Sequence, residues 1–179
     1  MNTATSARYA PTLRWLHWVM VLLIAAAYLL IEQRGVFPRG SDGRAAMMQG
    51  HFWMGMAIFV LVWLRLAARF SRAAPPITPP LDVYSAVAAK IMHLALYAFF
   101  LVMPLLGLAT AWTDGKQVLV PFTRIALPAM LAPNDELAHR LEDIHRSIGE
   151  AFYWVIGAHV LAALYHHFLR RDDTLRRML

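Results

Sequence analysis

Residues 145–159 read HRSIGEAFYWVIGAH, and this stretch decides the fold. It places His145 and His159 fourteen residues apart inside one long, mostly apolar segment. Fourteen residues at about 100° each complete close to four helical turns, so the two rings point from nearly the same face, ~21 Å apart along the axis. The spacing predicts one continuous helix that presents two identical ring ligands at two depths.

The composition around this segment is not that of a water-soluble domain. Fifty-nine per cent of the 179 residues are hydrophobic and only 16% are charged, whereas soluble domains carry about 25% charged residues. The apolar residues fall in runs near the ~20 residues that a helix needs to cross the hydrocarbon layer. We therefore predict an all-α integral membrane protein whose residues 1–179 form one four-helix transmembrane domain. The four helices are expected at about 11–31, 48–70, 83–112 and 135–170.

Charge and cysteine content narrow the class further. The chain has no cysteine, which excludes disulfides, iron–sulfur clusters and thiolate-ligated haem. Its net charge of +6 could indicate a nucleic-acid partner, but the basic residues flank the apolar runs, which favours a lipid bilayer and no nucleic acid.

The distribution of basic residues predicts the orientation. Four crossings put both termini on one side, and ten of the 17 Lys and Arg residues fall on that side, including Arg65, Arg69 and Arg72 at the end of the second apolar run. Cytoplasmic segments carry the excess of Lys and Arg. Both termini are therefore expected in the cytoplasm.

Two further histidines match the depths of the first two. His51 lies at the expected depth of His145, and His17 at that of His159. Low-spin haem needs one axial ligand on each face, so we predict the pairs His51–His145 and His17–His159 as ligands to the iron of two haems b. A single membrane histidine often serves as a helix–helix hydrogen bond or an interfacial anchor. Zinc or copper is a weaker alternative, because no carboxylate or thiol accompanies these histidines at depth.

Two glycines support the assignment of His51 and His145 as a ligand pair. Gly55 follows His51 by four residues, and Gly149 follows His145 by four, so each lies one turn inward on its ligand's own face. A porphyrin plane needs such a gap, because a side chain there would collide with the macrocycle. Gly55 and Gly149 are therefore predicted to pack against haem.

Several motifs together resemble the bacterial cytochrome b561 family. They are RWLHW at residues 14–18, HLALY at 93–97 with PLLG at 104–107, and HRSIG at 145–149. Further segments, AAY at 26–28, EQRGVFPR at 32–39 and AALYHHF at 162–168, are similar to the superoxide oxidase branch of that family.

The resemblance implies an activity that composition and spacing do not give. It implies a superoxide:ubiquinone oxidoreductase in the bacterial inner membrane, which oxidises superoxide on the periplasmic side and passes the electrons to ubiquinone. The alternative is a non-catalytic cytochrome b subunit that links a partner dehydrogenase or hydrogenase to the quinone pool. A haem-free structural or transport protein is the third class, and the sequence identifies no protein partner.

Residues that would meet the substrates are suggested by charge and position. Superoxide is an anion, so Lys116 and Arg146 are the predicted catalytic cations, although Glu142 and Asp143 could make this merely a solvated face.

Quinone reduction needs proton donors near a haem. The candidates for quinone or haem-propionate contact are His93, Lys90, His166 and His167. His93 could instead be an alternative haem ligand, and His166 and His167 could be interfacial anchors.

Overall fold

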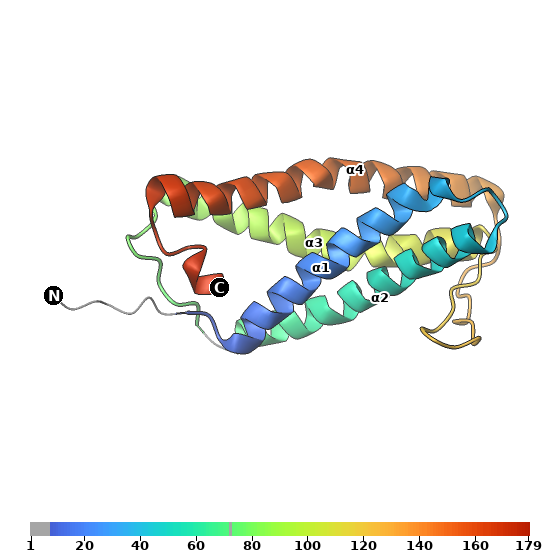
Figure 1. Ribbon diagram of the computed structural model, residues 1–179, viewed down its shortest axis with the longest axis horizontal. Helices are drawn as coiled ribbons and strands as arrows, with labels where there is room; N and C mark the ends of the chain where they lie inside the picture. Colours follow the sequence, from blue (N-terminus) through green and yellow to red (C-terminus); the bar gives the residue numbers. More distant parts are fainter. Residues whose placement is uncertain (1–7, 72) are drawn as a thin grey trace.

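The computed structural model describes residues 8–71 and 73–179, so Arg72, which entered the charge count, lies outside the described residues. Four long helices account for most of this chain (Figure 1). They are α1 (Pro11–Gln33), α2 (Asp42–Phe70), α3 (Val83–Thr113) and α4 (Asp135–Tyr165). The described residues also form three short helical turns, namely η1 (Arg34–Val36), the π-helical η2 (His166–Arg170) and η3 (Arg176–Met178).

Polar side chains set where three of the helices begin. Asp82 and Asn134 each accept a hydrogen bond from the backbone three residues on, at 2.9 Å, and so cap α3 and α4. Ser41 caps α2 in the same way, accepting from the N–H of Arg44 at 3.4 Å. The prediction that the second helix begins near residue 48 is therefore wrong, because this cap starts it at Asp42 and adds a polar first turn.

The bundle has two distinct ends (Figure 1). The terminal end holds the first described residues, the described part of the connection between α2 and α3 (residues 73–82) and the segment that follows α4. The loop end holds the short connection between α1 and α2 and the long 114–134 connection between α3 and α4. Each end therefore collects polar residues from segments that are distant in the sequence.

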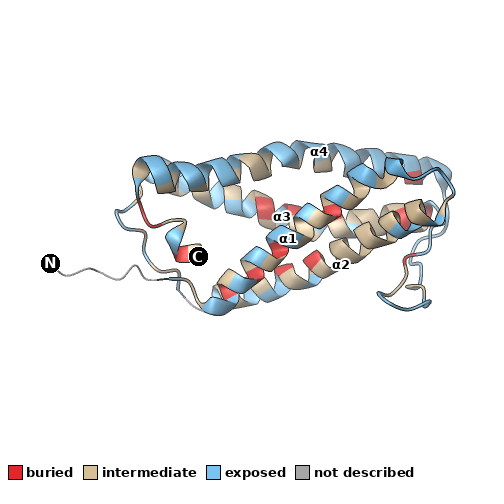
Figure 2. Cartoon of the chain, in the orientation of Figure 1, coloured by how far each residue is buried: buried red, intermediate tan, exposed pale blue. Residues whose placement is uncertain are grey.

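The apolar surface of the bundle faces outward. All four helices are long and apolar enough to cross a membrane. Large apolar side chains such as Leu22, Leu94 and Trp154 are exposed, and few positions along the four helices are buried (Figure 2). A small core between α1 and α2 is formed by Met20, Ala27, Ile58 and Val62. This arrangement suits a solvent of lipid tails, in which helices satisfy their own backbone hydrogen bonds.

Helix packing follows the order of the chain. Among the described residues, α1 packs along α2, α3 along α4, and α2 along α3, but neither α1 nor α2 packs closely along α4. The rings of Phe99 and Phe152 stack at 3.8 Å between α3 and α4. Gly50 lets α2 approach α1, since a Cβ there would lie 3.1 Å from Leu30. Among the described residues α1 does not pack closely along α3 either, so the wider spacing separates α1 from both α3 and α4, and α2 from α4.

Candidate functional site

The loop end contains the first predicted histidine pair. The rings of His51 on α2 and His145 on α4 have centroids 6.2 Å apart, with planes inclined at 82°. His51 donates its Nδ1–H to the carbonyl of Ala27 on α1 at 2.9 Å. A histidine that donates from one ring nitrogen keeps the other as a lone-pair donor, which is the tautomer a metal ligand needs.

Toward the terminal end, three histidine rings from three helices lie close together. His17 on α1 and His159 on α4 have ring centroids 6.4 Å apart, with planes inclined at 80°. His93 on α3 lies 5.9 Å from His159. Arg65 of α2 interacts electrostatically with all three rings and also donates to the carbonyl of Leu13 at 3.4 Å. The second predicted pair is therefore brought together, and a third ring accompanies it.

The separation of the paired rings fits iron ligation. Metal–imidazole bonds are about 2 Å long, so two imidazoles on opposite faces of one haem iron have centroids about 6 Å apart. His51–His145 and His17–His159 both meet this requirement. Each pair also joins α4 to a helix that does not pack closely along it among the described residues, which is the spacing a porphyrin between them requires.

Helix packing also separates the two possible partners of His159. His93 lies on α3, which packs directly along α4, whereas His17 lies on α1, which does not. A porphyrin cannot be accommodated between two helices in direct contact. The arrangement therefore favours His17 over His93 as the partner of His159.

Glycines provide room beside the loop-end pair. A Cβ added to Gly55 would meet no atom within 4 Å, and one added to Gly149 would meet only Met103, at 3.7 Å. Gly107 on α3 has a different role, because a Cβ there would lie 3.1 Å from Cε1 of His145. Nδ1 of His145 is buried and has no hydrogen-bond partner among the described residues. These features fit a haem held between His51 and His145.

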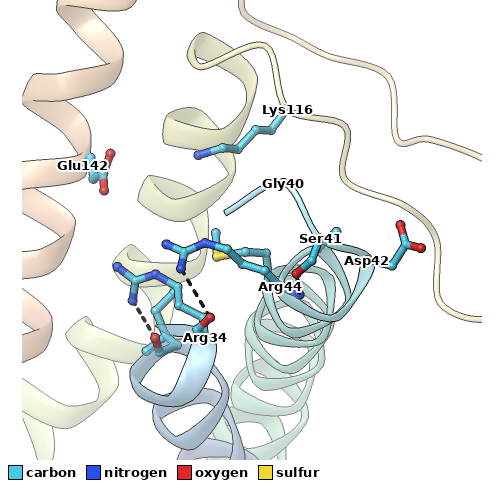
Figure 3. Close-up of a pocket in the computed structure, with 10 residues that line it drawn as sticks. Arg34, Gly40, Ser41, Asp42, Arg44, Lys116 and Glu142 are labelled. Atoms are coloured by element: carbon cyan, nitrogen blue, oxygen red, sulfur yellow. Dashed lines mark hydrogen bonds between the residues drawn. The ribbon is translucent and has the colours of Figure 1, made fainter. Parts of the chain in front are cut away.

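A cationic pocket opens at the loop end. Its volume is 360 Å³, and Arg34, Arg44 and Lys116 contribute the positive charges, with Asp42 and Glu142 on its rim (Figure 3). Arg34 and Arg44 are fixed by hydrogen bonds to the carbonyls of residues 31 and 34, at 2.5 and 3.3 Å. Met48 also lines this pocket, and it lies three residues before His51 on α2, which places the pocket about one helical turn from the loop-end histidine pair.

The two cations predicted from sequence lie in different surroundings. Lys116 lines the pocket and forms an ion pair with Asp114. Arg146, next to His145 in sequence, forms an ion pair with Asp143 at 2.5 Å, and its side chain is 60% exposed. Arg146 does not line the pocket, whereas Arg34 and Arg44 do. The structure thus groups Lys116 with residues from η1 and α2.

The candidates for quinone contact lie at or near the terminal end. Lys90 is exposed on α3, and His93 joins the three-histidine cluster. Nδ1 of His167 is buried without a partner among the described residues. His166 has a partner that the sequence analysis missed, because its Nδ1 lies 2.5 Å from Oδ2 of Asp172. The chain reverses direction after α4 and so brings His166 and Asp172 together, and no sequence motif predicts this reversal.

Hydrogen bonds keep two carboxylates at this end ionised. Burial alone would raise the pKa of Asp172, but hydrogen bonds from Thr174 and His166 hold that pKa below its ordinary value. The backbone N–H and hydroxyl of Ser85, together with Arg170, hold the pKa of Asp82 well below its usual range. Arg170 thus lies between two carboxylates that both remain charged.

The sequence profile of prokaryotic cytochrome b561 matches residues 8–179, nearly the whole chain. The protein is a member of the prokaryotic cytochrome b561 family. It is 36% identical to cytochrome b561 homolog 1 of Escherichia coli (strain K12) over 172 residues, covering 96% of this chain and 97% of that protein. It is also 33% identical to the probable superoxide oxidase CybB of Yersinia pestis over 164 residues, covering 92% and 91% of the two chains.

Membership of this family settles the class of the molecule. As a member of the family, and with four apolar helices among its described residues, the protein is a multi-pass membrane cytochrome b of the electron-transport type, and the family's prosthetic group is haem b. The predicted fold class, an all-α four-helix membrane bundle, is confirmed. The resemblance found from RWLHW, HLALY and HRSIG is confirmed as well.

Proposed function

We propose that this cytochrome b561 homologue holds two haems b, one between His51 and His145 and one between His17 and His159. The ring separations of 6.2 and 6.4 Å support this count. Bound haem supplies a one-electron carrier at each of the two depths. The chain's own contribution is to fix each ring, as Ala27 does for His51, and to leave space beside it, as Gly55 and Gly149 do.

We further propose that the protein oxidises superoxide at the loop end and reduces ubiquinone. The observation that carries this proposal is the cationic pocket about one helical turn from His51. Two superoxide anions each lose one electron and leave as dioxygen, while one ubiquinone gains two electrons and two protons and leaves as ubiquinol. The name of the Yersinia pestis relative, probable superoxide oxidase, supports the same reaction class.

The pocket residues act on the substrate through charge. Arg34, Arg44 and Lys116 attract a small monoanion and raise its local concentration, and a concave site strengthens this effect. Arg146 adds to the field from outside the pocket, but its pairing with Asp143 weakens that contribution. Asp42 and Glu142 reduce the net charge, so the attraction is local to the pocket.

We place ubiquinone at the terminal end, where proton donors and acceptors gather. His93, Lys90, His166 and His167 are the proposed contact residues, and Arg65 holds a positive charge beside the histidine cluster. This assignment puts the loop end in the periplasm and both termini in the cytoplasm of a bacterium, in the inner membrane. Superoxide then reacts from water, and the apolar quinone enters from the lipid.

The test uses purified protein without any partner. Superoxide generated in the presence of a short-chain ubiquinone should reduce the haem within the mixing time and then yield ubiquinol. The alternative, a subunit that only links a dehydrogenase or hydrogenase to the quinone pool, predicts haem that a chemical reductant reduces and superoxide does not. That second result would overturn the proposed reaction.

A further inference from the structure

The chain reverses direction directly after α4. The helix ends in the π-helical turn His166–Arg170, and Arg171 takes a left-handed conformation with φ of 57°. This reversal brings Asp172 back onto the first residue of the turn: its N–H donates to the carbonyl of His166 at 3.1 Å, and its Oδ2 lies 2.5 Å from Nδ1 of the same residue. π-helical turns are often found at functional sites.

Asp172 is fixed from every side. It is 1% exposed, and its Oδ1 accepts a hydrogen bond from the N–H of Thr174 at 2.9 Å. Nε of Arg170 lies 3.3 Å from its Oδ2, and Arg170 also pairs with Asp82 at 3.0 Å. A buried carboxylate held this way fixes the tautomer and the plane of the imidazole that it contacts.

The segment that carries Asp172 is fastened to the terminal end. Asp173 and Thr78 form two hydrogen bonds. The N–H of Asp173 donates to the carbonyl of Thr78 at 3.1 Å, and the N–H of Thr78 donates to the carboxylate of Asp173 at 2.9 Å. Trp18 of α1 donates its indole N–H to the carbonyl of Met178 at 2.9 Å. Residues 171–179 therefore cover the end of the bundle and hold the His166–Asp172 pair in place.

The position of His166 relates it to the terminal-end histidines. It follows His159 by seven residues, which is about 10 Å along the helix and nearly the same face. Its Nδ1 is engaged by Asp172, and its Nε2 has no hydrogen-bond partner among the described residues. The charged group in contact with it is Asp172, which also contacts Arg170, and Arg170 in turn pairs with Asp82 at the start of α3.

We propose that His166 and Asp172 form a proton-donating pair for ubiquinone, a role that rests on the quinone reduction proposed above. In its imidazolium form His166 gives the Nε2 proton to one reduced quinone oxygen and becomes neutral, while its Nδ1–H stays on the carboxylate. The other oxygen takes its proton from bulk solvent, and the electrons come from the two superoxide anions. Solvent at the terminal end then reprotonates His166. Asp172 is the positioning residue, because it touches only the imidazole.

The test follows quinone reduction separately from superoxide oxidation. The haem of purified protein is first reduced by a limiting amount of chemical reductant, and its reoxidation by a short-chain ubiquinone is followed between pH 6 and pH 9. Asp172→Asn should slow reoxidation roughly tenfold or more and move the alkaline limb of the profile to lower pH. The quinone concentration at half-saturation should stay unchanged, because the substitution leaves quinone binding intact.

Asp173→Asn is the matched control. It removes the same charge from the same segment, and the hydrogen bond from the N–H of Thr78 then has a neutral amide oxygen as its acceptor in place of the carboxylate. A purely structural role for residues 171–179 predicts equal losses of rate and thermal stability in both variants, and that result would overturn the proposal. A wild-type rate and pH profile in Asp172→Asn would overturn it too.

A second variant covers the case in which Asp172→Asn does not fold. His166→Gln keeps an amide that can donate to Asp172 but carries no proton that it can transfer. Slow reoxidation in this variant supports the proposal, and wild-type reoxidation refutes it. Failure of the proposed function would look different, since wild-type haem would then not be reduced by superoxide although chemically reduced haem still reacts with quinone.

Discussion

The two ends of the bundle present paired histidine rings in very different surroundings. At the loop end, His51 and His145 lie beside a water-accessible pocket whose charge comes from Arg34, Arg44 and Lys116. At the terminal end, His17 and His159 lie beside a third histidine, and the C-terminal segment contributes the buried carboxylate of Asp172. The first environment suits an anion arriving from water, and the second suits a neutral molecule that needs protons.

The largest expected effect is on haem content. His145→Ala should remove the loop-end haem and leave much of the other, and His159→Ala should do the reverse, because the two pairs share α4 but lie ~21 Å apart. Each variant should contain about half as much haem per polypeptide as the wild-type protein, as measured by pyridine haemochrome analysis. Loss of both haems from a variant that still folds would mean that the two ends are not independent.

The next effect concerns the charge at the loop end. The double variant Arg34→Gln, Lys116→Gln should slow haem reduction by superoxide about tenfold at low ionic strength, since two of the three pocket cations are gone. At 1 M salt the difference should nearly vanish, because screening then acts over about 3 Å. Arg146→Gln should have a smaller effect, because Asp143 already pairs with that residue.

The matched control for this prediction removes two cations from the same end without touching the pocket. Arg124→Gln, Arg140→Gln lowers the net charge equally, and neither residue lines the pocket. Stopped-flow rates for both double variants at two ionic strengths would distinguish local from overall charge. Equal slowing in the two variants would contradict a role for the pocket.

A smaller effect is expected from Gly55→Ala. Protein packing alone predicts a gain of up to about 1 kcal/mol in helix stability, because alanine is the better helix former and nothing lies within 4 Å of the new Cβ. A haem against that face would collide with the methyl group, so we expect partial loss of the loop-end haem. Haem content and thermal stability are measured together on one sample. Full haem content with a more stable protein would show that Gly55 does not face haem.

The smallest effect is a pH dependence at the terminal end. The pKa of Asp172 is lowered in the folded protein, so its contribution to stability is complete above the ordinary aspartate pKa of about 3.9 and is lost as the pH falls through the folded-state value. Acidification below pH 4 should therefore loosen residues 171–179 before the helices separate. Hydrogen exchange at Asp172 and Thr174 would report this. Protection that persists until global unfolding would contradict it.

Much of the fold could be predicted from sequence because the membrane imposes strong rules on it. The lengths of the apolar runs predicted four helices, and the fourteen-residue spacing of His145 and His159 predicted that both lie on one face of the same helix. The start of α2 could not be placed, since a polar first turn capped by Ser41 looks like loop in a hydropathy pattern. Helix ends are the least certain part of any such prediction.

The site was only partly predictable for a related reason. Depth along a helix follows from residue counting, which is why the histidine pairs could be matched. Which cations share a pocket depends on how loops fold over the ends, so Lys116 was found but its grouping with Arg34 and Arg44 was not. Asp172 contacts His166, and Gly107 lies close to His145. An aspartate or a glycine in the sequence does not by itself indicate which residue it will lie beside in the fold.

The central claim is that one chain carries two histidine-ligated haems, one at each end. Pyridine haemochrome analysis of the purified wild-type protein, set against its polypeptide concentration, tests this claim most directly. The account predicts two haems b per chain, with the low-spin spectrum that paired histidine ligands give. A value of one haem or none in fully folded, haem-saturated protein would contradict it.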